Sequence, residues 1–150
     1  MIQRIQSVYL LVVTILLIVC MCTPVGAYIA EDYSVSKFTN LCIVSADGVK
    51  DYAPWAMFVI LVVAALLSFT TIFMFKKRML QIRMTIFNSL LLVGYYIAAL
   101  AFYFALKNDE NMFRIGWALC LPLVSIILNI LAIRAIGRDE VMVKAADRLR

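Results

Sequence analysis

Four long apolar stretches, separated by short polar segments, dominate the pattern of this 150-residue chain. They cover about residues 6–29, 53–75, 84–106 and 115–133. Each is close to the roughly 20 residues that a helix needs to cross a bilayer, and none contains Asp, Glu, Lys or Arg. The pattern predicts a single domain with the fold of an all-α membrane protein, an antiparallel bundle of four transmembrane helices.

The first apolar stretch has an alternative interpretation as a cleaved signal peptide. Arg4 would be its basic start, and the small residues near Gly26 would be its cleavage site. The apolar run is longer than the roughly 7–15 residues of a typical signal-peptide core, which favours a retained helix.

Four polar segments separate or follow the predicted spans, and the one over residues 107–114 is predicted to be a second outer loop with no net charge. The loop over residues 30–52 has four acidic and two basic side chains, and Asp47-Gly48 within it is typical of a tight hairpin turn. Residues 76–83 form a short basic turn, which makes the second and third spans antiparallel neighbours. The tail over residues 134–150 is predicted to be a short amphipathic helix. It could lie on the inner leaflet, dock a cytosolic partner or, as the favoured interpretation, serve only as an anchor that fixes the topology.

The placement of basic residues predicts the orientation. With both termini in the cytoplasm, ten basic residues lie on the inner side and four on the outer side. The inner ones are Arg4, Lys76, Lys77, Arg78, Arg83, Arg134, Arg138, Lys144, Arg148 and Arg150. The outer ones are Lys37, Lys50, Lys107 and Arg114. An excess of Lys and Arg in short cytoplasmic loops is the usual determinant of topology, so Lys76, Lys77, Arg78, Arg83, Arg134 and Arg138 are predicted anchors.

Composition supports the membrane class and narrows the chemistry. The chain is 65% hydrophobic and 15% charged, against about 25% charged in soluble domains. Its net charge of +5 sits at the ends of the spans, where it suits anionic lipid head groups and does not indicate nucleic-acid binding. There is no histidine and no C-x-x-C pair, so we expect no metal or other cofactor.

Polar residues inside the spans predict helix contacts. Asn88 and Asn129 fall at similar depths, near Thr70 and Thr71, and we expect an interhelical hydrogen bond between the two amides. A polar pocket for a ligand is the alternative interpretation. Small residues at helical spacing form two further packing faces, which are Gly94, Ala98, Ala101 and Ala105 on the third helix, and Pro122 and Ser125 on the fourth. Pro122 is expected to kink its helix.

Four cysteines give a redox hypothesis. Cys20, Cys22, Cys42 and Cys120 all fall on or near the predicted outer side, where disulfides persist. That arrangement resembles quinone-dependent disulfide oxidoreductases, although those use closely paired loop cysteines. A buried thiol is a poor nucleophile, which favours packing over catalysis.

Several separated stretches carry a family resemblance. They are Met1–Leu11, Leu80–Arg83 with Asn88, Leu121–Ile126, Leu131–Ile136 and Asp139–Arg150. Together they resemble a family of small four-span bacterial inner-membrane proteins defined only as a domain of unknown function. The resemblance implies that topology, a multi-pass location in the bacterial inner membrane, and no activity.

Three functional hypotheses follow. The first is a non-catalytic accessory or packing subunit that associates with a membrane protein partner or with itself as a homo-oligomer. The second is a thiol–disulfide oxidoreductase that uses the four cysteines. The third is a small transporter or pore. The absence of ionisable groups from the predicted spans disfavours this hypothesis.

Overall fold

The structure is a computed structural model that describes residues 2–52, 54–74, 76–106 and 112–149. Its four long helices are α1 (Ile2–Cys22), α2 (Trp55–Phe73), α3 (Arg78–Leu106) and α4 (Cys120–Arg148). Each of them is long and apolar enough to cross a membrane. The expectation of four such helices is therefore confirmed.

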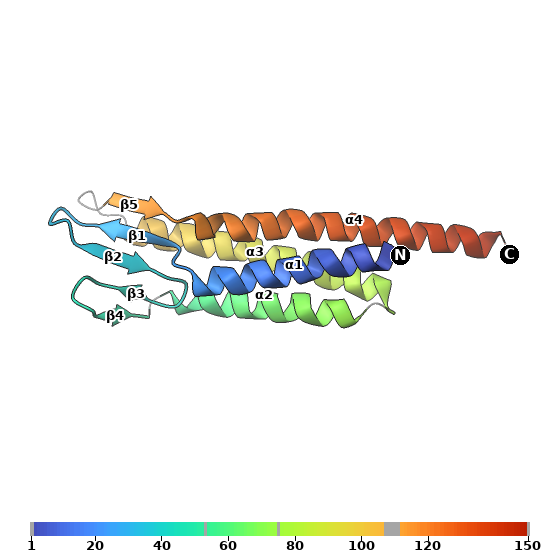
Figure 1. The fold of residues 1–150 in the computed structure, drawn as a ribbon, viewed down its shortest axis with the longest axis horizontal. Coiled ribbons are helices and arrows are strands. Elements are labelled where there is room, and N and C mark those ends of the chain that lie inside the picture. The colour runs from blue at the N-terminus through green and yellow to red at the C-terminus, as the bar shows by residue number, and fades with distance from the viewer. Residues whose placement is uncertain (1, 53, 75, 107–111, 150) are drawn as a thin grey trace.

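The helices form a four-membered ring in which each touches the two next to it. α1 packs on α2 and α4, and α3 packs on α2 and α4. The helices run antiparallel along one axis, and α4 extends beyond the others past the N-terminal end of α1 (Figure 1).

A small sheet covers one end of the bundle, so the expectation of an all-α protein is wrong there. The strands are β1 (Gly26–Ile29), β2 (Val35–Phe38), β3 (Ile43–Val44), β4 (Lys50–Asp51) and β5 (Met112–Ile115). They pair antiparallel in the order β4-β3-β2-β1-β5. The predicted hairpin is confirmed between β3 and β4, where Gly48 has φ +82°, a conformation that glycine adopts without steric cost.

The first helix ends earlier than the apolar pattern suggests. The predicted span continued to residue 29, but α1 stops at Cys22 and β1 begins at Gly26. Pro24 follows the helix end, and the Thr23 hydroxyl caps it by bonding to the carbonyl of Val19 at 2.9 Å. Apolar content alone did not distinguish this buried strand from the end of a helix.

The boundaries of the last two helices also differ from the prediction. α3 begins at Arg78, so most of the predicted 76–83 turn is helical. α4 runs unbroken to Arg148, so the tail continues α4 and is not a separate amphipathic helix. Its 29 residues span about 43 Å at 1.5 Å per residue. The predicted second outer loop falls largely on residues 107–111, which lie outside the described residues.

Pro122 does not occupy the position that the kink prediction assumed. A 3-10 turn, η1 (Trp117–Leu119), precedes α4, and Pro122 lies in the first turn of that helix. Because first-turn backbone N–H groups have no partner within the helix, proline is tolerated there.

A continuous hydrophobic core joins the bundle to the sheet. Leu17, Met57 and Tyr95 from the helices belong to the same buried cluster as Val25 and Phe38 from the sheet region. The bundle and the sheet are therefore one packed unit, and the outer faces of the helices stay apolar.

Candidate functional site

Polar side chains line the interior of the bundle on all four helices. Those less than one-tenth exposed are Gln6, Thr14, Ser68, Thr71, Gln81, Thr85, Asn88, Ser125, Asn129 and Asp139. Most hydroxyls bond to a carbonyl one turn earlier, as Thr85 does to Gln81 at 2.8 Å. Ser68 instead reaches the carbonyl of Leu10 on α1 at 3.1 Å. These groups satisfy their hydrogen-bonding needs within the protein.

The two interior asparagines are different. Asn88 is 2% exposed and Asn129 is fully buried, yet neither amide nitrogen nor amide oxygen has a hydrogen-bond partner among the described residues. The predicted bond between them is therefore wrong in this structure. A buried amide without a partner costs about 1–3 kcal/mol, so both sites are destabilising as they stand.

Other members of the predicted polar and packing sets divide into buried and exposed residues. Thr71 is buried, but Thr70 is exposed and bonds to the carbonyl of Leu66 on its own helix. On α4, Pro122 and Ser125 are buried as predicted.

The predicted packing face of α3 is misplaced. Ala101 and Ala105 are exposed, Ala98 is partly buried, and a Cβ added at Gly94 would meet no atom within 4 Å. The buried face instead follows Gln81, Thr85, Asn88, Leu92 and Tyr95, at alternating spacings of four and three. Small side chains predicted a close helix approach, but polar and large residues occupy the interior.

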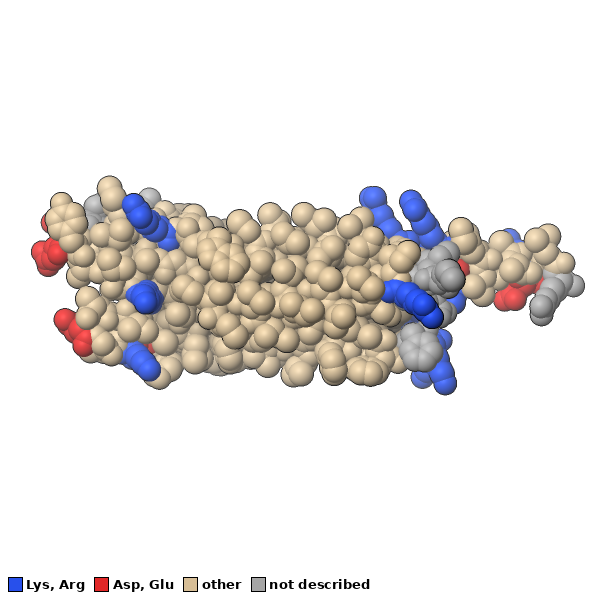
Figure 2. All heavy atoms as spheres, in the orientation of Figure 1, with Lys and Arg blue, Asp and Glu red and all other residues tan. Residues whose placement is uncertain are grey.

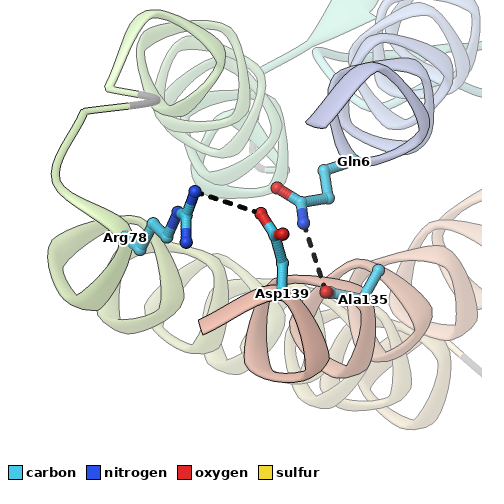
Figure 3. Close-up of polar contacts among 4 residues, drawn as sticks. All are labelled: Gln6, Arg78, Ala135 and Asp139. Carbon is cyan, nitrogen blue, oxygen red and sulfur yellow. Dashed lines mark hydrogen bonds and ion pairs between the residues drawn. The ribbon is translucent and has the colours of Figure 1, made fainter. Parts of the chain in front are cut away.

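Three helices meet through two polar contacts at the basic end, the end of the bundle that carries Arg4, Lys76, Lys77, Arg83 and Arg134. Arg78 of α3 pairs with Asp139 of α4 at 3.3 Å, and Gln6 of α1 donates to the carbonyl of Ala135 at 3.2 Å (Figure 3). Asp139 is only 9% exposed, and a buried carboxylate needs a partner of opposite charge, which Arg78 provides. Arg78, which the sequence predicts to be a topology anchor, therefore joins α3 to α4 in the structure.

Several other basic residues line a groove beside this ion pair. The groove has a volume of about 860 Å³ and lies between the start of α3 and the far part of α4. Lys76, Lys77 and Arg83 line it with exposed side chains, whereas Lys144 pairs with Glu140 at 3.3 Å. Arg134 and Arg138 are also exposed. The excess of positive charge along the groove suits anionic groups.

The four cysteines lie near the sheet end, and all are free thiols. Cys20 and Cys42 are buried, while Cys22 and Cys120 are exposed. The Cys20 thiol donates to the carbonyl of Ala118 at 3.6 Å, which joins α1 to η1, the turn that precedes α4. Among the residues that the structure describes, no three His, Cys, Asp or Glu side chains could hold a metal ion together.

Asn40 connects this region and was not identified from the sequence. It is fully buried in the connection between β2 and β3. Its amide nitrogen donates to the carbonyl of Cys20 at 2.7 Å, and its amide oxygen accepts from the Tyr95 hydroxyl at 2.6 Å. One side chain thus joins the sheet region to α1 and α3. Nothing in its local sequence distinguishes it from an ordinary loop asparagine.

Comparison with known families gives one clear result. The family model described as Domain of unknown function (DUF4293) matches residues 2–149, nearly the whole chain. A comparison with curated proteins finds no match.

We expect Asn129→Leu to leave the protein equally stable or to stabilise it by about 1–2 kcal/mol, because it removes a buried amide that has no partner. The measurement is thermal unfolding of the purified protein in one detergent. A loss of more than about 1 kcal/mol would contradict the structure, since it would show that the amide has a partner.

The same change at Asn40 should have the opposite sign. Asn40→Leu leaves the Tyr95 hydroxyl and the Cys20 carbonyl without their partner, and should destabilise the protein by about 2–4 kcal/mol. The two asparagine variants, unfolded side by side, are matched controls for each other. Equal changes in unfolding stability for the two variants would show that the Asn40 hydrogen bonds do not stabilise the protein.

Proposed function

The chain belongs to the DUF4293 family, a domain of unknown function, and from that premise we propose that it is a multi-pass protein of the bacterial inner membrane that acts as a non-catalytic accessory subunit. In this proposal all four helices cross the bilayer. The apolar outer faces of the helices support it, because exposed apolar side chains such as Leu66, Leu90 and Ile97 suit lipid rather than water.

The distribution of charge supports an orientation with the basic end in the cytoplasm. Charged residues gather at the two ends, and a wide band between them carries none on the visible face (Figure 2). The sheet end has acidic residues at its tips and a few basic ones behind them, whereas the opposite end of the bundle carries a cluster of basic residues and the projecting helix beyond it also carries acidic ones. The basic groove would then face the anionic head groups of the inner leaflet.

A non-catalytic role is supported by the structural partners of the reactive groups. The Cys20 thiol bonds to a backbone carbonyl, Asp139 pairs with Arg78, and Tyr95 bonds to Asn40. Each of these contacts joins two helices or a helix and the sheet region. The redox hypothesis needs thiols that form a disulfide, and it stays a prediction that thiol trapping can test.

The observation that carries the accessory role is the projecting part of α4. Beyond the bundle, Met142 is 60% exposed and Leu149 is 90% exposed, and with Ala145 they share one face at spacings of three and four. A helix with an exposed apolar face is stable in water when a partner covers it.

We infer that this partner is a second copy of the same chain. The projecting segment, residues 140–150, carries two acids, Glu140 and Asp147, and three bases, Lys144, Arg148 and Arg150, so its net charge is only +1. So small a net charge does not select a strongly acidic or basic partner. An identical helix supplies both signs and the same apolar residues, as a symmetric dimer requires.

A photo-crosslinking residue at position 145 tests the association in native membranes. We expect a crosslinked dimer, because Ala145 lies between Met142 and Leu149 on the exposed apolar face. The matched control is position 147, which lies on the opposite face and should give little product. No product at either position would contradict association through α4, and a product with a different protein alone would contradict the second copy.

A further inference from the structure

A second groove, the α1–α4 groove, lies between α1 and α4 at the basic end of the bundle and has a volume of about 390 Å³. The side chains along it come from both helices and include Ile5, Tyr9, Leu131, Arg134, Arg138 and Met142. It shares no residue with the groove between α3 and α4. Its volume is within the range of about 300–1,000 Å³ that is typical of small-molecule sites.

A hydrogen bond holds the two walls of the α1–α4 groove together. Gln6 of α1 donates to the carbonyl of Ala135 on α4 at 3.2 Å (Figure 3). Gln6 is only 4% exposed, and Ala135 belongs to the groove lining, so the bond lies beneath the groove. The spacing of the walls is therefore set before any molecule binds, which lowers the cost of binding.

The two guanidinium groups in the α1–α4 groove have no anionic partner among the described residues. Arg134 and Arg138 are exposed, and neither forms an ion pair with a described side chain. Asp139 is adjacent in the sequence but pairs with Arg78 of α3. No acidic residue stands three or four positions from either arginine along α4. Two like charges one turn apart repel each other, so an anion bound between them would be favourable to both.

The face of α4 that carries these arginines changes from apolar to basic along its length. Val124, Ile127 and Leu131, the apolar stripe, precede Arg134 and Arg138 at alternating spacings of three and four, so all five share one face. The three apolar side chains are 42%, 52% and 40% exposed. From Val124 to Arg134 the helix rises about 15 Å, half of the roughly 30 Å of a hydrocarbon core. A phospholipid has the same division, with a chain about one leaflet long and a phosphate at its end.

The lining favours an anionic head group over a zwitterionic one. Every phospholipid has a phosphate, but a zwitterionic head group also carries an ammonium group, which needs an anion nearby. No acidic side chain is among the described residues that line the groove, so an ammonium group beside Arg134 and Arg138 would meet like charge. Arginine also presents pairs of N–H groups that match two oxygens of one phosphate. Basic pockets between helices on the cytoplasmic side are typical sites for anionic lipid head groups.

We propose that the α1–α4 groove binds one anionic phospholipid of the inner leaflet, with its phosphate on Arg134 and Arg138 and an acyl chain along the apolar stripe. The inference rests on the proposed membrane location and orientation, which place this end of the bundle at the inner leaflet. It goes beyond a general attraction of basic residues to the membrane surface, because it assigns one lipid to one pair of arginines. The groove ends at Met142, where the exposed face of the projecting segment begins.

The test is native mass spectrometry of the detergent-purified protein mixed with equal amounts of phosphatidylglycerol and phosphatidylcholine that have the same acyl chains. We expect the wild-type protein to retain phosphatidylglycerol about 3- to 30-fold more, as two exposed charge pairs would give. The double variant Arg134→Gln with Arg138→Gln should lose that preference. Equal retention of both lipids by the wild-type protein would overturn the proposal.

The matched control removes the same charge from the same end of the bundle. Lys76→Gln with Lys77→Gln changes two exposed residues outside the α1–α4 groove and should keep the preference for phosphatidylglycerol. Equal losses from the two double variants would overturn the assignment to this groove, since they would show that any basic residue at this end serves equally well.

A second pair of variants keeps every charge and changes the shape of the site. Ala135→Leu adds bulk to the groove lining and should reduce retention of phosphatidylglycerol. Ala146→Leu adds the same bulk at an exposed residue outside the lining and should not. Full retention by Ala135→Leu would overturn the assignment of the lipid to this groove.

Inorganic phosphate distinguishes a lipid site from a site for a soluble phosphate. In large molar excess it should leave phosphatidylglycerol bound, because phosphate alone has no acyl chain to contact the apolar stripe. Complete displacement of the lipid by phosphate would overturn the lipid assignment.

These outcomes are distinct from failure of the proposed function. If the chain does not insert into a bilayer, or inserts with the basic end outside, the membrane proposal itself fails. If it inserts as proposed and the wild-type protein retains both lipids equally, only the lipid site fails.

Discussion

The contact that ties this structure together is the buried amide of Asn40. It binds the end of α1 through the Cys20 carbonyl and α3 through the Tyr95 hydroxyl, from a connection between two strands. Its two hydrogen bonds add direction to the apolar contacts between the sheet and the bundle, which are not directional by themselves. With them, the sheet has a fixed position, and so does the pairing of β1 with β5.

The interior of the bundle follows a second constraint. In an apolar environment each polar group needs a partner, and helices satisfy their own backbones while Ser and Thr hydroxyls bond to carbonyls one turn earlier. Asparagine has two polar atoms and a short side chain, so it needs a partner from elsewhere. Asn40 has two such partners, whereas Asn88 and Asn129 have none among the described residues. Asparagine therefore stabilises the sheet end through Asn40 and destabilises the interior of the bundle at Asn88 and Asn129.

Much of the architecture could be predicted from the sequence, because long apolar runs report helix number directly. The β3–β4 hairpin, the buried face of α4 and the Glu140–Lys144 pair also follow from local rules. The rest depends on contacts between distant segments. β1 pairs with β5 across more than eighty residues, and Asp139 pairs with Arg78 although the two are far apart in the sequence. The α3 face was misjudged because small residues were weighted over the polar repeat at Gln81, Thr85 and Asn88.

The central claim is that the helices cross a membrane with the basic end in the cytoplasm, and thiol labelling tests it most directly. In a variant without the native cysteines, Asp47→Cys places one thiol at the tip of the sheet end, and Lys77→Cys places one at the basic end; both positions are exposed. An impermeant maleimide applied to spheroplasts should label position 47 at once and position 77 only after permeabilisation. The reverse order would contradict the orientation, and labelling of both from outside would contradict the claim that the chain spans the membrane.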